Sequence, residues 1–309
     1  MSSLPRPAAP AQDETRGVLA IPAFRKLWNS MLFSSLGDWL GLLATTALAQ
    51  QLSGDSYAKA NFAIAGVFIA RLLPSVFLGP LAGVLADRFD RRKLMVVCDI
   101  LRTGLYVSIP IFHNYFWLYT ATILVECVTL FWSPAKEASV PNLVPRSKLE
   151  SANQVSLLAA YGTAPIAAII FSILALFSNA FNALLPSFAT NAVDIALYIN
   201  AASFAFAAYT VWGLHEIPKI KDSKKDSEVG VAKSLWQGWK AVSGSKIIRG
   251  LVVGMVGAFV AAGAVIGLAR TFVGDLGGGE AAYGVLFGAV FTGLALGIAA
   301  GPKVFAQFS

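Results

Sequence analysis

Apolar residues in this chain are gathered into blocks of about 20, the length that an α-helix needs to cross the hydrocarbon core of a bilayer. Hydrophobic residues make up 56% of the 309 residues and charged residues only 13%. A soluble domain usually carries about 25% charged residues, so this chain lacks the polar surface to cover a core of its size. The pattern predicts an all-α fold, a polytopic transmembrane helical bundle.

Eight segments are expected to span the membrane. They cover roughly residues 27–50, 61–86, 94–112, 115–134, 154–177, 188–213, 247–273 and 282–302. Four regions follow from this layout. They are a disordered cytoplasmic N-terminus (1–26), a six-helix N-terminal half (27–213), a basic cytoplasmic loop with an amphipathic segment (214–246), and a partial C-terminal half of two helices (247–309).

Basic residues alternate with these spans. If the N-terminus is cytoplasmic, the inner segments hold 20 of the 24 Lys and Arg residues, and the outer loops hold only Lys59. The remaining three, Arg71, Arg102 and Arg270, lie within spans. Because cytoplasmic loops of membrane proteins are enriched in Lys and Arg, the pattern predicts a multi-pass protein of the cell (inner) membrane with its N-terminus in the cytoplasm.

Other classes of protein are disfavoured by what the sequence lacks. Cys98 and Cys127 lie in apolar segments without metal-ligand spacing, so neither a metal site nor any other cofactor is expected. There is no glycine-rich phosphate loop of the ATPase type, and no zinc-protease or serine-hydrolase motif. The net charge of +7 comes from segments between spans rather than from one nucleic-acid-binding face. An enzyme is therefore not expected.

One short inner segment carries a distinctive motif, GPLAGVLADRFDRRK, at residues 79–93. Its two glycines are four residues apart on one helix face, where a neighbouring helix could approach closely. The aspartate continues that face to the cytoplasmic end, and basic residues follow. A carboxylate–arginine cluster can latch helix ends in one conformation and release them in another. The residues predicted to form this conformational switch are Gly79, Gly83, Asp87, Arg88, Arg91 and Arg92.

This motif resembles the signature loop of the major facilitator superfamily. The stretches 34–39 (SSLGDW), 133–135 (SPA), 140–145 (VPNLVP) and 200–204 (NAASF) are similar to the branch that contains macrolide and siderophore (enterobactin-type) exporters. The resemblance covers about residues 20–300. It implies a secondary active transporter, with proton-coupled efflux of a drug- or siderophore-like small molecule. The implied partners are that substrate and the lipid bilayer.

The chain departs from this family in two places. Residues 162–165 lack the glycine before proline of the fifth-span antiporter element. The second half also stops after two spans, so the chain is expected to be truncated at its C-terminus. The alternative function is a truncated, non-transporting membrane protein, or a half-transporter that needs a second chain to supply the missing helices.

Three ionisable residues in the spans are candidates for proton or substrate coupling. At a helical rise of about 1.5 Å per residue, Asp38 is expected roughly 18 Å and Arg71 roughly 24 Å from the inner edge of the membrane. An Asp38–Arg71 ion pair is one hypothesis, and separate positions in a water-filled cavity are the other. Glu126 lies close to mid-bilayer, where burial disfavours its charged form. Glu126 is therefore predicted to carry protons.

Arg102 has two candidate partners. It lies at a depth similar to that of Glu126, which it could neutralise. Asp99 precedes it by three residues on the same helix face, and such neighbours pair readily. Asp99–Arg102 is the favoured structural pair.

Aromatic residues of the fourth span are expected to form interfacial belts, with Trp117 and Trp132 at the two edges of the span. The alternative is that these residues line a ligand pocket.

Overall fold

The structure is a computed structural model. It describes residues 17–54, 57–86, 89–177, 191–217, 240, 243–251, 253–254, 257, 268–269, 272–274 and 276–305. The helices are α1 (Pro22–Leu52), α2 (Tyr57–Ala86), α3 (Arg91–Phe112), α4 (Tyr115–Leu143), α5 (Leu149–Leu176), α7 (Ala192–Trp212) and α10 (Gly279–Phe305). Short 3-10 helices at Val18–Ala20 and Arg146–Lys148 precede α1 and α5. Most of the predicted amphipathic loop and of the predicted seventh span lies outside the described residues, as do residues 1–16 and Arg270.

The prediction of an all-α membrane bundle is confirmed. Six of the described helices (α1 to α5 and α7) are long and apolar enough to cross a membrane. They coincide with the first six predicted spans, and α10 contains the predicted eighth. No strand occurs among the residues that the structure describes.

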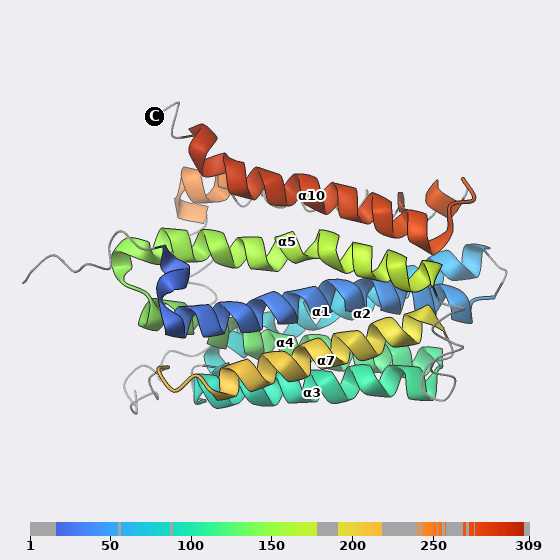
Figure 1. The fold of residues 1–309 in the computed structure, drawn as a ribbon, viewed down its shortest axis with the longest axis horizontal. Helices are drawn as coiled ribbons and strands as arrows, with labels where there is room; N and C mark the ends of the chain where they lie inside the picture. Colours follow the sequence, from blue (N-terminus) through green and yellow to red (C-terminus); the bar gives the residue numbers. More distant parts are fainter. Residues whose placement is uncertain are drawn as a thin grey trace, which may run out of the picture.

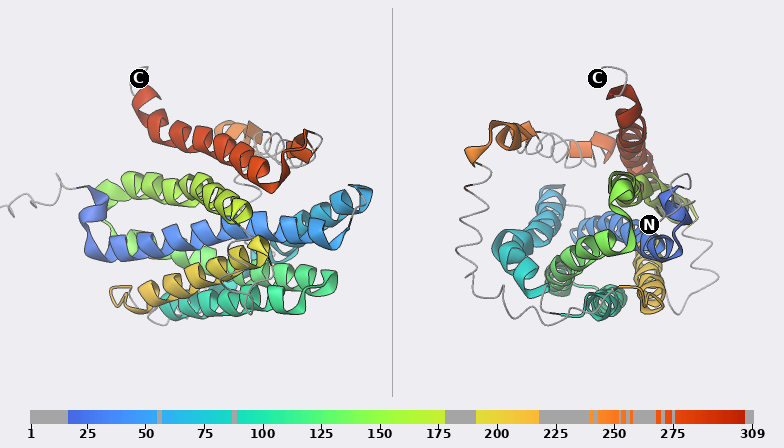
Figure 2. Two further views of the ribbon diagram at one scale, coloured as in Figure 1. Left: turned by 45° about the vertical axis from the view of Figure 1, so that its right-hand side comes forward. Right: turned by 90° about the vertical axis from the view of Figure 1, so that its left-hand side faces the viewer.

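Helix α1 lies at the centre of the bundle. It packs against α7, α5 and α2, and it is the most buried of the six spanning helices. Helix α3 lies against α7 and α4, and α2 runs along α4 (Figure 1). Helix α10 lies on the opposite side of the bundle from α3, stacked on α5 (Figures 1 and 2). The charged side chains described below come from α1, α2, α3 and α4.

Local sequence signals explain where α3 and α4 begin and end. The Asp90 carboxylate accepts a hydrogen bond from the Lys93 backbone N–H and so caps α3 (3.1 Å). Helix α3 ends at Phe112, and the next residue, His113, is in the left-handed region (φ 44°). Asn114 then caps α4 by accepting from the Trp117 N–H (2.9 Å). Caps of this kind satisfy backbone donors at a helix start, and here they allow a two-residue turn between two spans.

Helix α4 is longer than predicted. The sequence places its end near Pro134, but it continues through Pro134 and Pro141 to Leu143. Prolines are tolerated in membrane helices where neighbouring groups satisfy the freed carbonyls. Between the two prolines, the Ala138 carbonyl accepts hydrogen bonds from Arg91 Nη1 and from the side-chain amide of Asn142, each at 2.9 Å, and the first of these ties α4 to α3. The extra turns place Lys136 on the helix, where the prediction had a loop.

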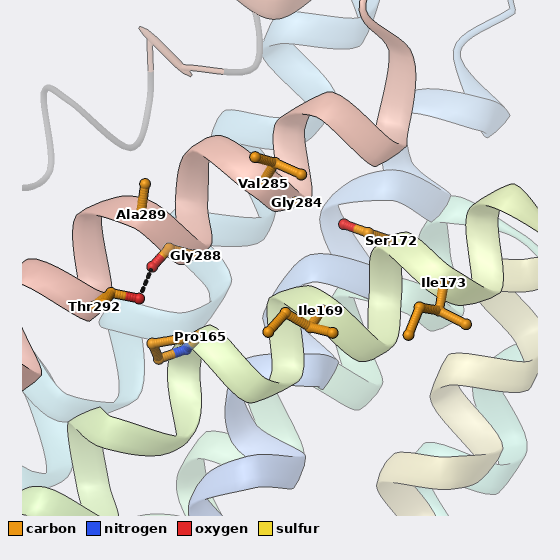
Figure 3. A pocket seen from close by; sticks show the side chains of 9 residues that line it. All are labelled: Pro165, Ile169, Ser172, Ile173, Gly284, Val285, Gly288, Ala289 and Thr292. Atoms are coloured by element: carbon orange, nitrogen blue, oxygen red, sulfur yellow. Dashed lines mark hydrogen bonds between the residues drawn. The ribbon is translucent and has the colours of Figure 1, made fainter.

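Small residues bring α10 close to α5. A methyl group at Gly288 would stand 3.3 Å from the Ala168 side chain. Ser172 donates across the interface to the Ala281 carbonyl (3.1 Å). Beside this contact the two helices line an almost entirely apolar pocket of about 330 Å³ (Figure 3). Gly284 and Gly288 are thus closely packed against α5, whereas Gly293 has open space beside it.

Candidate functional site

Six charged side chains lie in the interior parts of helices α1 to α4. They are Asp38 on α1, Arg71 on α2, Asp99 and Arg102 on α3, and Glu126 and Lys136 on α4. Three are acidic and three are basic, so the set is balanced in charge. Because a charge within the membrane is costly and usually faces the interior of a bundle or a cavity, this balance makes the set a candidate functional site.

Arg71 pairs with Glu126 across α2 and α4. A guanidinium nitrogen lies 3.7 Å from the Glu126 carboxylate, and the side chains are 16% and 19% exposed. Arg71 also donates to the Tyr106 hydroxyl at 3.2 Å. The ion pair is thus partly exposed, unlike a completely buried one.

This pair replaces the hypothesised Asp38–Arg71 pair. Among the ion pairs of the described residues, Arg71 is joined to Glu126 and not to Asp38. The reason is helix packing, because α2 follows α4 over a longer stretch than it follows α1. Asp38 nevertheless lies close to this pair, since the charges of Arg102, Arg71 and Lys136 interact with its carboxylate. The three coupling candidates are thus gathered in one region.

Asp99 and Arg102 form the ion pair that their spacing predicts. Both side chains are completely buried. Asp99 accepts a second hydrogen bond, from the Trp132 indole (3.2 Å). The Arg102 guanidinium lies over the rings of Trp132 and Phe204, at 4.8 and 4.4 Å from their centroids. Cation–π contact and the carboxylate together compensate for burial of the charge.

The prediction that Trp132 belongs to an interfacial belt is wrong. Only 6% of this residue is exposed, and its indole N–H points at the Asp99 carboxylate. Belt tryptophans instead place their polar edge at the headgroup level. Since α4 continues for eleven residues beyond Trp132, this position lies inside the bundle rather than at its rim.

Two of the stretches that carry the family resemblance meet where α1 crosses α7. A methyl group at Gly37 would run into Ser203 and Asn200 and would lie 3.4 Å from the Phe204 ring. Only glycine allows α7 to come this close. The contact places α7 beside α3 as well, where the Phe204 ring stacks on Tyr106 (centroids 5.6 Å apart).

Sequence reasoning missed Tyr106 and Lys136. Tyr106 follows Arg102 by four residues, so it lies on the same face of α3, but its bond to Arg71 depends on α2. Lys136 follows Trp132 by four residues, and its ammonium lies 5.6 Å from the Trp132 ring centroid. The i, i+4 spacing was the available signal in both cases, and for Lys136 it was hidden by the assumed helix end at Pro134.

The predicted switch residues are only partly described. Asp87 and Arg88 lie outside the described residues, and Gly83 is described only as part of helix α2. Gly79 has open space beside it. Arg91 donates to the Ala138 carbonyl (2.9 Å), and a guanidinium nitrogen of Arg92 lies 3.5 Å from the Trp212 carbonyl. These contacts join α3 to the ends of α4 and α7, and the switching role stays a prediction.

Comparison with known proteins identifies the family. The family described as transmembrane secretion effector, of the major facilitator superfamily, matches residues 15–309. The chain belongs to this family. An uncharacterised MFS-type transporter of Bacillus subtilis, YfiS, is 30% identical over 189 residues, covering 61% of this chain and 41% of the relative. Macrolide efflux protein A of Streptococcus pyogenes is 27% identical over 247 residues, covering 77% of this chain and 55% of the relative.

A third relative is the putative bacilysin exporter BacE of Bacillus subtilis, which is 28% identical over 135 residues, or 43% of this chain and 32% of the relative. This major facilitator chain therefore spans about half the length, or less, of the curated relatives that it matches. Family membership and the apolar helices make it a multi-pass membrane protein of a transporter family. Nothing in the comparisons points to a second chain.

Proposed function

We propose that this chain takes part in proton-coupled export of a small amphipathic molecule. In this proposal it lies in the cell (inner) membrane with its N-terminus in the cytoplasm, and residues 27–213 form the N-terminal half of the transporter. The observation that carries the proposal is the Arg71–Glu126 ion pair, partly accessible within the bundle and joined to Tyr106. Relatives named for macrolide efflux and bacilysin export support a drug-like substrate; a siderophore-like one is equally compatible with the site.

The geometry suggests how a proton is coupled to movement. An ionised Glu126 holds Arg71 at 3.7 Å, which links α2 to α4. A proton arriving on a Glu126 carboxylate oxygen neutralises it and removes most of the attraction between the two helices. Arg71 keeps its hydrogen bond to Tyr106 on α3 and becomes available to Asp38, whose carboxylate it already influences. Protonation thereby exchanges one set of helix contacts for another, which is what a two-state transporter requires.

The switch segment at 79–93 extends this scheme to the cytoplasmic ends of the helices. Arg91 already ties the start of α3 to α4 near its end. We infer that Asp87 and the basic residues after it hold these ends together in one state and release them in the other. Breaking the Arg71–Glu126 pair frees α2 from α4, the helix to which Arg91 ties α3, so the two events favour the same conformational change.

Glu126→Gln tests the proposal. The purified chain is reconstituted in vesicles that contain a pH-sensitive dye, and erythromycin is added as the probe. Wild-type protein is expected to change the internal pH when the probe is added, because each transported molecule exchanges for protons. The Glu126→Gln variant is expected to give no change above that of protein-free vesicles, because its amide cannot take up a proton.

Glu137→Gln is the matched control. Glu137 lies on the same helix, is 72% exposed and pairs with Lys136 at 3.8 Å. It should leave the signal intact, since the exposed carboxylate of Glu137 is screened by solvent and contributes little to its partner. Full proton coupling in Glu126→Gln would remove Glu126 from the mechanism. An equal loss in both variants would also count against the proposal, because it would trace the defect to α4 in general.

A further inference from the structure

A groove runs along the outer side of the bundle between α3 and α7. Its volume is about 460 Å³, and it is lined from α3 by Val96, Ile100 and Thr103 and from α7 mainly by Ala205, Tyr209 and Trp212. The hydroxyl of Thr103 is already engaged, donating to carbonyls within the protein. The groove thus presents an apolar surface along its length, in a chain whose surroundings are lipid.

The positively charged side chain of Arg92 lies at one end of this groove. Arg92, Val96, Ile100 and Thr103 follow one another at intervals of four, four and three residues, so they lie on one face of α3. Arg92 is in the first turn of α3, and its guanidinium lies 3.5 Å from the carbonyl of Trp212, the last residue of α7. Among the described residues Arg92 has no carboxylate partner. Its guanidinium therefore brings a positive charge to the mouth of the groove.

The neighbouring cation is already neutralised. Lys26 on α1 reaches the same end of α7, with its ammonium 3.4 Å from the Gly213 carbonyl, but it is paired with Glu216 at 3.7 Å. The charge that Arg92 brings to this rim is thus not cancelled by the local pair. Tyr209 and Trp212, 75% and 68% exposed, flank the rim with aromatic rings, as expected for side chains at the level of lipid headgroups.

The distance from Arg92 to the far end of the groove matches the thickness of one leaflet. Arg92 and Thr103 are eleven residues apart, which is about 16 Å along a helix. Half of a hydrocarbon core of about 30 Å is roughly 15 Å. A lipid whose phosphate contacts Arg92 would therefore lay one acyl chain along the groove from the interface to the middle of the membrane.

We propose that the α3–α7 groove is a binding site for an anionic phospholipid, with the headgroup phosphate on Arg92 and an acyl chain against Ile100 and Ala205. The site does not depend on the direction of transport or on the coupling ion. Electrostatic attraction of an anionic headgroup to an interfacial cation and burial of a chain in an apolar groove are separate contributions, so each can be removed alone.

Native mass spectrometry of the purified chain in detergent provides the test. The probes are phosphatidylglycerol and phosphatidylcholine with identical acyl chains. Wild-type protein should bind the anionic lipid in preference to the zwitterionic one. Arg92→Gln should reduce that preference about fivefold, the factor expected for loss of one interfacial cation. Ala205→Trp should weaken both lipids equally, because the exposed Ala205 position would then be filled by a ring.

Two control variants make the result decisive. Arg146→Gln removes an exposed charge at the same end of the bundle, before α5 and away from the groove. Ala202→Trp adds the same ring at an exposed position of α7 that does not line the groove. Both should bind lipid as wild type does. Equal effects of Arg92→Gln and Arg146→Gln, or of Ala205→Trp and Ala202→Trp, would overturn the site. So would the absence of any preference for phosphatidylglycerol in the wild type.

Discussion

Replacing Arg102 with leucine is expected to lower the free energy of unfolding by about 3–5 kcal/mol. The guanidinium is completely buried, pairs with Asp99 and lies between the rings of Trp132 and Phe204. Leucine removes the charge, and among the described residues it leaves the Trp132 indole as the one side-chain donor to the Asp99 carboxylate. Unfolding in a titration with sodium dodecyl sulfate, followed by circular dichroism, measures the difference.

The double variant Asp99→Leu/Arg102→Leu distinguishes loss of the pair from loss of packing. Replacing a buried ion pair entirely by apolar residues is often close to neutral, so the double variant should be clearly more stable than Arg102→Leu alone. A double variant that is less stable than either single one would contradict this explanation. It would show that Asp99 and Arg102 act through partners other than each other.

The Asp99–Arg102 pair illustrates what sequence can predict. Its two members are three residues apart on one helix, so helical geometry alone brings them together. The six spanning helices follow in the same way from apolar blocks of sufficient length. In both cases the information is local, and the structure agrees with the prediction.

Contacts between helices were harder to predict. Arg71 and Glu126 meet because α2 runs along α4, and nothing in the spacing of residues shows which helices are neighbours. Estimated depths in the membrane placed Arg71 near Asp38. Depth alone, however, does not determine how a helix is rotated about its axis or which helix it packs against. The end of α4 was also missed, because Pro134 was assumed to end the helix, whereas membrane helices tolerate internal prolines and α4 continues to Leu143.

Replacing Gly41 with alanine is expected to lower the free energy of unfolding by about 1–3 kcal/mol, the usual effect of overpacking a core. The added methyl group would stand 2.8 Å from the Tyr106 hydroxyl oxygen and closer still to the Asn200 amide nitrogen. Both neighbours are buried, at 2% and 0% exposure, so neither side chain can swing into solvent. The helices must separate instead, and a lower melting temperature of the purified protein would report it.

Gly104→Ala is the matched control, because Gly104 is also within a spanning helix but has open space around it. That change should be neutral or stabilise by about 0.5–1 kcal/mol, the helix propensity that glycine lacks. Equal melting temperatures for the two variants would mean that the α1–α7 contact is not tightly packed.

Substitution of Gly41 should also affect the candidate functional site, since the Tyr106 hydroxyl accepts a hydrogen bond of 3.2 Å from Arg71. A side chain at position 41 therefore displaces Tyr106, and with it one of the two contacts that position the Arg71–Glu126 pair.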